Sequence, residues 1–380
     1  MSLTNRQLFQ RDPVSSQLLN DGQARITDGL TEQEWNTLRE ELSHFVCEGQ
    51  YEDGIVRILN SYLRNLGGNA QSAAWVSGFY GSGKSHLLKM LGHLWVNTTF
   101  PGDGVKARDL VVELPADVKA ALTELDTESR RQKCGAHMVM TTLPSGGGNE
   151  SARLNVLGAI FRSKGLPTKY ECARFCLYLK RYGWYDQVVK AVEKKGKSFL
   201  AEVNNFYVSP IIREAVLACD PDLGKGDSYQ QLLRNQFGKV TDISTDDFIA
   251  VAKEVLSEDG KLPLTILVLD EVQLFVGSDE NRATAVTELA EAINKQFQGR
   301  VQLVGAGQNA LSSDTPHFRR LKDRFTIPVE LSDTDVEVVT RKVLLQKRPE
   351  HMDALKKVLD KYSGEIQRQL QGTHFGPRVE

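Results

Sequence analysis

The sequence predicts an α/β fold in which helices cover both faces of a parallel sheet. Strand-like apolar runs alternate with helix-like runs along most of the 380 residues. A glycine-rich turn joins the first predicted strand, which contains Trp75, to a leucine-rich helix that reaches Trp95. A later apolar run, residues 265–269, ends in two carboxylates, as expected where a buried parallel strand reaches its carboxyl end.

Residues 1–70 are expected to form a helical amino-terminal segment. Thr31 is followed three residues later by Glu34, which is the pattern of a capping box at the start of a helix. A second helix is expected over 53–66 and should end at the glycine pair that follows it. Apolar residues after the capping box recur at helical spacing: Trp35, Leu38, Leu42 and Phe45.

Residues 71–330 are expected to form the core of the fold. Residues from about 166 to 260 have a continuously helical pattern and are interpreted as an insertion. Earlier in the chain, the residues between the helix over 84–97 and about residue 133 show no single helical or strand periodicity. Residues 331–380 are expected to form a partial helical lid. Strands are expected at 72–78, 135–143, 264–272, 300–307 and 327–331, and further helices at 84–97, 152–165, 282–297, from near Ser332, and at 350–371.

The overall charge gives no general attraction to nucleic acid or to an anionic membrane. The chain has 47 Lys and Arg against 49 Asp and Glu, a formal net charge of −2. Any such partner must therefore contact a local patch. Residues 177–200 mix aromatic and basic side chains, which suits nucleic-acid binding, but aromatics at helical spacing with lysines pointing outward are more typical of a packed core.

The cysteines and the amino terminus are typical of a cytoplasmic protein. Of the five cysteines, only Cys172 and Cys176 are closely spaced, and one pair without a second pair or histidines favours buried free thiols over a zinc site. The amino terminus lacks the apolar region of a signal peptide, and apolar runs are too short to cross a membrane. We expect a soluble cytoplasmic chain with no membrane partner.

The glycine-rich turn matches the G-x-x-x-x-G-K-[ST] pattern of a phosphate-binding P-loop. Its glycines let successive backbone N–H groups face one anion, and the helix that follows adds the positive end of its dipole. A lysine at this position reaches the β- and γ-phosphates, and a serine places its hydroxyl on Mg²⁺. The predicted nucleotide-binding residues are Gly78, Phe79, Tyr80, Gly81, Ser82, Gly83, Lys84 and Ser85.

Two carboxylates at the end of the strand over 264–272 complete the predicted ATP site. Asp270 is expected to bind Mg²⁺ together with Ser85, and Glu271 to polarise the attacking water. The strand over 300–307 ends in Gln308 and Asn309, and the amide of Gln308 could orient that water. Because Lys84 and Asp270 lie far apart in the chain, a helical insertion must separate the two motifs.

The order of these motifs resembles that of the AAA+ superfamily. In that superfamily an arginine before the fifth strand acts on the γ-phosphate of a neighbouring subunit, and "LKDRF" resembles the segment that carries it. The resemblance implies that Arg324 is catalytic in trans, that the protein is a homo-oligomer, and that Arg341 or Arg378 could serve as a lid arginine. A solvated basic face is the alternative for Arg319, Arg320, Lys322 and Arg324.

Four stretches together resemble the large P-loop ATPases of BREX phage-defence systems, the BrxC/PglY family. They are "LFQRDP", "WVSGFYGSGKSHLLKML", "LVLDEVQLF" and "LSDTDVEVVTRKVLLQK", in residues 1–100 and 262–348. Members of that family are much longer, so the chain is an amino-terminal part or a short relative. The resemblance implies an ATPase that remodels or assembles a DNA-acting defence complex, with a DNA methyltransferase and other system proteins as partners and possible contact with DNA.

Two other functions remain open from the sequence. One is an ATPase of the origin-recognition or loader type, which assembles on DNA for replication. The other is a scaffold that binds nucleotide without hydrolysing it, although such a scaffold has no need of the water-polarising Glu271. All three functions use ATP, and hydrolysis also requires Mg²⁺.

Overall fold

The structure is a computed structural model that describes residues 4–10, 31–145, 151–308, 320–332, 342 and 345–370. The chain divides into two compact units. One unit combines Met1–Gly22 with Asp333–Glu380, and the other spans Gln23–Ser332. Each unit is described by itself below.

A five-stranded parallel sheet forms the centre of the larger unit, which confirms the predicted α/β fold class. The strand order is β2-β3-β4-β1-β5, and every neighbouring pair is parallel. All residues of β1, β3 and β4 are buried, which explains why these strands are almost continuously apolar in the sequence. The strands, all at predicted places, are β1 (Ala74–Ser77), β2 (Ala136–Thr142), β3 (Leu264–Asp270), β4 (Val301–Gly307) and β5 (Ile327–Glu330).

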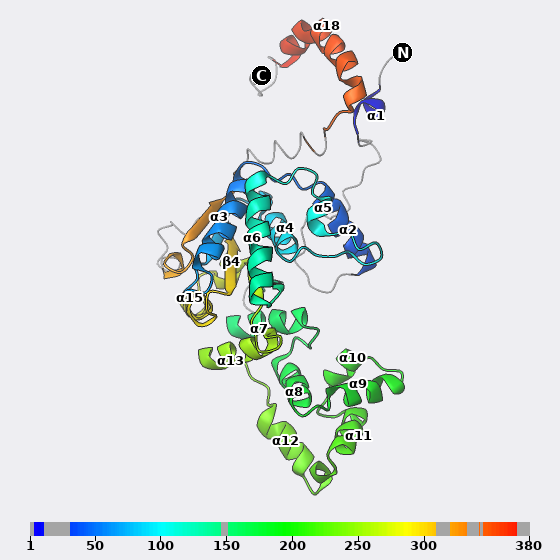
Figure 1. Cartoon of the computed structure of the whole chain (residues 1–380), viewed down its shortest axis with the longest axis vertical. Helices are drawn as coiled ribbons and strands as arrows, with labels where there is room; N and C mark the ends of the chain where they lie inside the picture. The colour runs from blue at the N-terminus through cyan, green and yellow to red at the C-terminus, as the bar shows by residue number, and fades with distance from the viewer. Residues whose placement is uncertain are drawn as a thin grey trace. The chain divides into compact units, whose positions relative to one another are not determined.

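The two faces of the sheet carry separate hydrophobic cores, because successive strand residues point to opposite faces. Ala74 and Val76 of β1 belong to one core, whereas Trp75 between them belongs to the other. The first core includes residues of α2 (Glu32–Ser43), α3 (Gln50–Asn65), α4 (Lys84–Val96), α5 (Ala107–Leu110) and α6 (Ala116–Gln132), several of which are labelled around β4 in Figure 1. The second includes residues of the helical insertion, α14 (Val272–Val276) and α15 (Glu280–Gln296).

Two of the amino-terminal helices, α2 and α3, pack in the same core as Ala74 and Val76 of β1. The Thr31 hydroxyl accepts a hydrogen bond from the Glu34 N–H at 3.3 Å, and the Thr31 N–H donates to the Glu34 carboxylate at 2.7 Å, which confirms the capping box. On the same helix Glu41 forms a buried ion pair with Lys89 of α4, at 2.6 Å. The second predicted helix begins earlier than expected, at Gln50, after Gly49.

The mixed stretch that ends near residue 133 contains a long helix that the sequence analysis did not identify. This helix, α6, buries Val118, Ala121, Leu122 and Leu125 at the spacing of one helical face. It ends at Lys133, whose φ of 50° is left-handed. Its many charged residues concealed this periodicity.

The predicted insertion, over about 166–260, consists of helices joined by turns and loops, with no strand among these residues. Gly183, with φ of 72°, separates the helix that ends at Arg181 from the one that begins at Tyr185, and the Ser209 and Ser244 hydroxyls cap the helices that begin at Pro210 and Thr245. Of the aromatic residues in the basic stretch, Tyr178, Trp184 and Tyr185 pack against the core. α7 (Ala152–Ser163) precedes the insertion, at the place of the helix predicted over 152–165. The helices of the insertion are α8 (Tyr170–Arg181), α9 (Tyr185–Lys194), α10 (Phe199–Val203), α11 (Pro210–Cys219), α12 (Ser228–Gln236) and α13 (Thr245–Leu256), with a 3₁₀ turn at Pro221–Gly224.

The two closely spaced cysteines are buried, as expected. Cys172 and Cys176 are free thiols inside the insertion, and burial raises their pKa values to about 11 and about 12. The described part of the chain holds no helix with the length and apolar character needed to cross a membrane.

The smaller unit contains α1 (Asn5–Leu8) and α18 (Met352–Leu370), which follows a 3₁₀ turn at Pro349–His351. The Arg348 N–H donates to the Leu8 carbonyl at 2.9 Å, so the segment that follows α1 contacts the segment that precedes α18 within this unit. The predicted helix over 350–371 is confirmed by α18, whereas the one expected from near Ser332 lies mostly outside the described residues.

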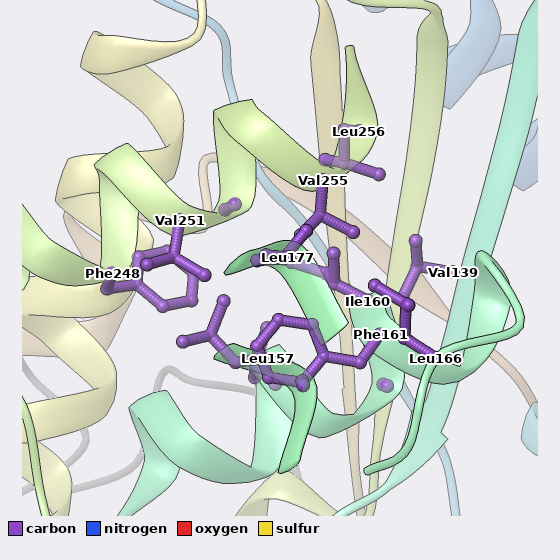
Figure 2. Close-up of a cluster of buried hydrophobic side chains, with 14 of the residues drawn as sticks. Val139, Leu157, Ile160, Phe161, Leu166, Leu177, Phe248, Val251, Val255 and Leu256 are labelled. Atoms are coloured by element: carbon purple, nitrogen blue, oxygen red, sulfur yellow. The ribbon is translucent and has the colours of Figure 1, made fainter. Parts of the chain in front are cut away.

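The insertion joins the sheet through a cluster of buried apolar side chains. Phe161 of α7, which is fully buried, lies in this cluster among residues from β2, α7, α8 and α13. Figure 2 labels Val139, Leu157, Ile160, Phe161, Leu166, Leu177, Phe248, Val251, Val255 and Leu256.

We expect Phe161→Ala to lower the free energy of unfolding by about 3–5 kcal/mol, because it leaves a cavity where the insertion meets the sheet. Urea denaturation measures this change. The control is Tyr182→Ala, since Tyr182 is 57% exposed, and it should cost about 1 kcal/mol or less. Equal losses in the two variants would contradict a continuous core.

Candidate functional site

The candidate site begins where β1 turns into α4. Gly81 and Gly83 have φ of 89° and 84°, a region that favours glycine. A Cβ on Gly78 would lie 2.5 Å from the Ser82 hydroxyl and 2.9 Å from the Leu331 carbonyl oxygen, so no larger residue fits there without a shift. A Cβ on Gly81 would meet no atom within 4 Å. The loop backbone is therefore packed tightly at its start and borders open space at Gly81.

Lys84, the first residue of α4, folds back across this loop. Its ammonium donates to the carbonyl oxygens of Gly78 and Phe79, at 2.7 and 2.9 Å. Burial lowers the pKa of Lys84, and the nearby carboxylates of Glu271 and Asp270 oppose this shift. A phosphate oxygen could replace these carbonyls as the acceptor, with charge to match.

Ser85 and Asp270 contact each other although they lie 185 residues apart in the sequence. The Ser85 hydroxyl donates to Asp270 Oδ2 at 2.6 Å, and the Glu271 N–H donates to Asp270 Oδ1 at 2.9 Å. Asp270 is only 4% exposed, so both oxygens of a buried carboxylate are fixed. A hydroxyl and a carboxylate are oxygen donors of the kind that Mg²⁺ takes from a protein when phosphates and water supply the rest. These residues therefore fit the predicted magnesium site.

Glu271 stands beside this pair in a strained backbone conformation. Its φ of 57° and ψ of 29° are left-handed, which costs about 1–2 kcal/mol in a residue with a Cβ. Burial and the Asp270 carboxylate raise the pKa of Glu271, whereas the Lys84 ammonium lowers it. Glu271 thus combines a strained backbone with a side chain repelled by a neighbouring carboxylate, and both features are common at catalytic sites.

Gln308 lies at the same edge of the sheet. β4 runs between β1 and β3, with Gly307 opposite Ser77 of β1 and Gly305 opposite Leu269 of β3. Gln308 directly follows β4 and is exposed, so the chain places it between the P-loop and the acidic strand end. Asn309 lies outside the described residues.

Gln273 and Trp75 also lie at this end of the sheet, where the sequence patterns did not predict them. A Cβ on Gly307 would lie 2.4 Å from Trp75 Cζ2 and 3.0 Å from Gln273 Oε1, so both side chains pack against the end of β4. A Cβ on Gly305 would lie 3.1 Å from Trp75 Cε3. The alternating glycines of β4 were the available signal, because they leave room for an indole ring on one face of the sheet.

Arg324 lies away from the P-loop. The Ile327 N–H donates to the Ala73 carbonyl at 3.1 Å, so the start of β5 lies beside the start of β1, whereas the P-loop follows the end of β1. Arg324 precedes β5, and its guanidinium donates to the Glu291 carboxylate of α15 at 2.8 and 3.2 Å. Arg324 therefore lies where β1 and β5 begin, whereas Lys84 of the same chain lies beyond the point where β1 ends.

The structure thus brings together Lys84, Ser85, Asp270 and Glu271, and it separates Arg324 from them. Their roles in catalysis stay predictions. Phe79 and Tyr80 at the tip of the loop are 44% and 77% exposed. Arg319, Arg341 and Arg378 lie outside the described residues.

No protein-family model matches the sequence. One similar solved structure is that of the Aeropyrum pernix ORC1 protein in complex with DNA, with 10% sequence identity and a TM-score of 0.35. The match covers 90% of this chain and 66% of the other. The described part of the chain itself shows a parallel sheet of order β2-β3-β4-β1-β5 with a glycine-rich loop between β1 and α4.

The raised pKa of Glu271 predicts how stability depends on pH. Because the folded-state pKa lies above the ordinary value of 4.5, the ionised carboxylate destabilises the fold above the folded-state pKa and has no such effect below pH 4.5. Glu271→Gln should therefore melt at a higher temperature than the wild type at neutral pH, and the difference should shrink as the pH falls below 4.5. Glu124→Gln, on the exposed side of α6, is the control. A lower melting temperature for Glu271→Gln at neutral pH would contradict the prediction.

Proposed function

We propose that this chain binds ATP with Mg²⁺ and hydrolyses it. The observation that carries the proposal is the convergence of Lys84, Ser85 and Asp270 at the carboxyl edge of a parallel sheet, with Glu271 beside them. Phosphate charge would be met by the Lys84 ammonium, the loop N–H groups and the amino end of α4. Ser85 and Asp270 would hold Mg²⁺, which neutralises charge on the phosphates.

The chemical step assigned to Glu271 is proton removal from water. As the water oxygen bonds to the terminal phosphorus, Glu271 accepts the proton, and the bond from that phosphorus to the bridging oxygen breaks. The electron pair of that bond leaves with ADP. Gln308, which directly follows the strand between the P-loop and Glu271, would orient the water.

Two substitutions separate binding from turnover. We expect Lys84→Ala to lose nucleotide affinity, since it removes the ammonium that meets the phosphates. We expect Glu271→Gln to keep ATP affinity while kcat falls by about 10²–10⁴-fold, because the amide cannot take the proton. Titration with a fluorescent nucleotide and a phosphate-release assay measure the two effects. Equal loss of binding in both variants would contradict this division of roles.

We also propose that the active form is a homo-oligomer in which Arg324 serves the site of a neighbouring copy. The supporting observation is that Arg324 and Lys84 of one chain lie at opposite edges of the sheet. In a head-to-tail assembly these two edges face each other. Turnover per chain should therefore rise with protein concentration.

Mixing two inactive variants tests this arrangement. Glu271→Gln and Arg324→Ala should each be inactive, whereas an equal mixture should recover about a quarter of wild-type turnover, because some interfaces combine an intact Glu271 with an intact Arg324. Glu291→Gln is the matched control, since it breaks the same ion pair but keeps the arginine. If the mixture stays inactive and Glu291→Gln is as impaired as Arg324→Ala, Arg324 has only a structural role.

The cellular role that we propose is ATP-driven remodelling or assembly of a phage-defence complex that acts on DNA in the cytoplasm. It is supported by the resemblance of four stretches to BREX ATPases. Replacing the chromosomal gene by its Lys84→Ala allele should raise the plating efficiency of phage and reduce methylation of host DNA. Unchanged values of both, together with a replication defect, would instead favour a loader-type ATPase.

A further inference from the structure

A tyrosine from the amino-terminal helices lies directly beneath the P-loop. Tyr51 is the second residue of α3 and is only 5% exposed. Its hydroxyl donates to the Ser82 carbonyl oxygen at 3.3 Å. A Cβ on Gly83 would lie 1.9 Å from that hydroxyl oxygen, so the hydroxyl occupies the space under the Gly83 Cα. This contact gives a second reason, besides its φ of 84°, why residue 83 is glycine.

The hydrogen bond from Tyr51 to the Ser82 carbonyl also sets the direction of the next N–H group, that of Gly83. In a planar trans peptide, the carbonyl of one residue and the N–H of the next point in opposite directions. The Ser82 carbonyl points toward Tyr51, so the Gly83 N–H points away from it. No hydrogen bond in the described part of the chain uses the Gly83 N–H. Tyr51 therefore holds the Ser82–Gly83 peptide so that the Gly83 N–H points away from the Tyr51 side of the loop.

Tyr51 is itself held rigidly. Its ring stacks on Phe45 with centroids 6.0 Å apart and an interplanar angle of 26°. On the same helix, Arg57 donates to the Pro328 carbonyl of β5 at 2.6 Å, and a Cβ on Gly54 would lie 2.6 Å from Val329 Cγ1. α3 is thus packed closely against β5, the outermost strand of the sheet. A donor group on such a helix can fix a loop more accurately than one on another loop.

We propose that Tyr51 is a positioning residue for phosphate: by holding the Ser82 carbonyl, its hydroxyl directs the Gly83 N–H toward the phosphate chain of the nucleotide. The inference rests on the proposed nucleotide site. It concerns the phosphates and not the base, so the same effect applies to any polyphosphate in the loop. Without the hydroxyl, the Ser82 carbonyl loses this hydrogen bond, the orientation of the 82–83 peptide is less restricted, and binding must order it further.

The experiment compares two tyrosines of the same helix. Tyr51→Phe keeps the ring but removes the hydroxyl. Tyr62→Phe is the matched control, because Tyr62 is fully buried on α3 and its hydroxyl donates to the Arg300 carbonyl at 3.0 Å, at the opposite edge of the sheet. Dissociation constants for ADP and for inorganic tripolyphosphate are measured by displacement of a fluorescent nucleotide, and thermal unfolding is followed for each variant.

We expect Tyr51→Phe to weaken ADP and tripolyphosphate by the same factor, about fivefold, which is the usual size for one lost hydrogen bond. Tyr62→Phe should bind both as the wild type does, although its thermal stability falls to a similar extent. Wild-type binding by Tyr51→Phe would overturn the inference. A loss confined to ADP would also overturn it, because Tyr51 would then act on the base.

A second measurement uses the ligand-free protein. Gly83→Ala should lower the melting temperature more in the wild type than in Tyr51→Phe, because part of its cost is the overlap between the new methyl group and the Tyr51 hydroxyl. Equal losses in the two backgrounds would overturn the assigned contact. The proposed hydrolysis is judged separately: a wild type that binds ADP and tripolyphosphate but does not turn over ATP would remove that function and leave the Tyr51 comparison intact.

Discussion

The contact between Ser85 and Asp270 is the constraint on which the rest of this structure depends. It requires β1 and β3 to end at the same edge of one sheet, which only parallel strands separated by long crossovers can achieve. The helical insertion lies in the chain between β2 and β3 and does not change where β1 and β3 end, so it can be accommodated without separating Ser85 from Asp270. The two hydrophobic cores hold these strands from opposite faces and so fix the distance between hydroxyl and carboxylate.

The site concentrates features that a stable protein otherwise avoids. Glu271 is left-handed and lies beside a second carboxylate, while Lys84 is partly buried. Each feature costs free energy, and the surrounding packing compensates for it. The Trp75 indole across Gly305 and Gly307 is part of that packing. A phosphate chain with its cation would relieve the carboxylate repulsion and give Lys84 a charged partner, so binding and local strain are coupled.

Two of the amino-terminal helices, α2 and α3, contact the elements that form the candidate site. Glu41 pairs with Lys89 on the P-loop helix, and Tyr51 supports the loop itself. At the other edge of the sheet, Arg324 is held by Glu291 and is directed away from its own site. The proposed nucleotide site thus lies at one end of the strands and Arg324 at the other, which is the arrangement that the proposed head-to-tail assembly needs.

The sequence by itself determined the five strands, the glycine loop and the acidic strand end, because each is encoded by residues close together in the chain, through periodicity, β-branching or glycine content. It also indicated the insertion, from the distance between Lys84 and Asp270. Only the tertiary structure decided that β4 lies between β1 and β3, that Tyr51 supports Gly83, and that Glu291 pairs with Arg324. These features join residues that are far apart in sequence, and local patterns carry no information about which distant side chains meet when the two cores close.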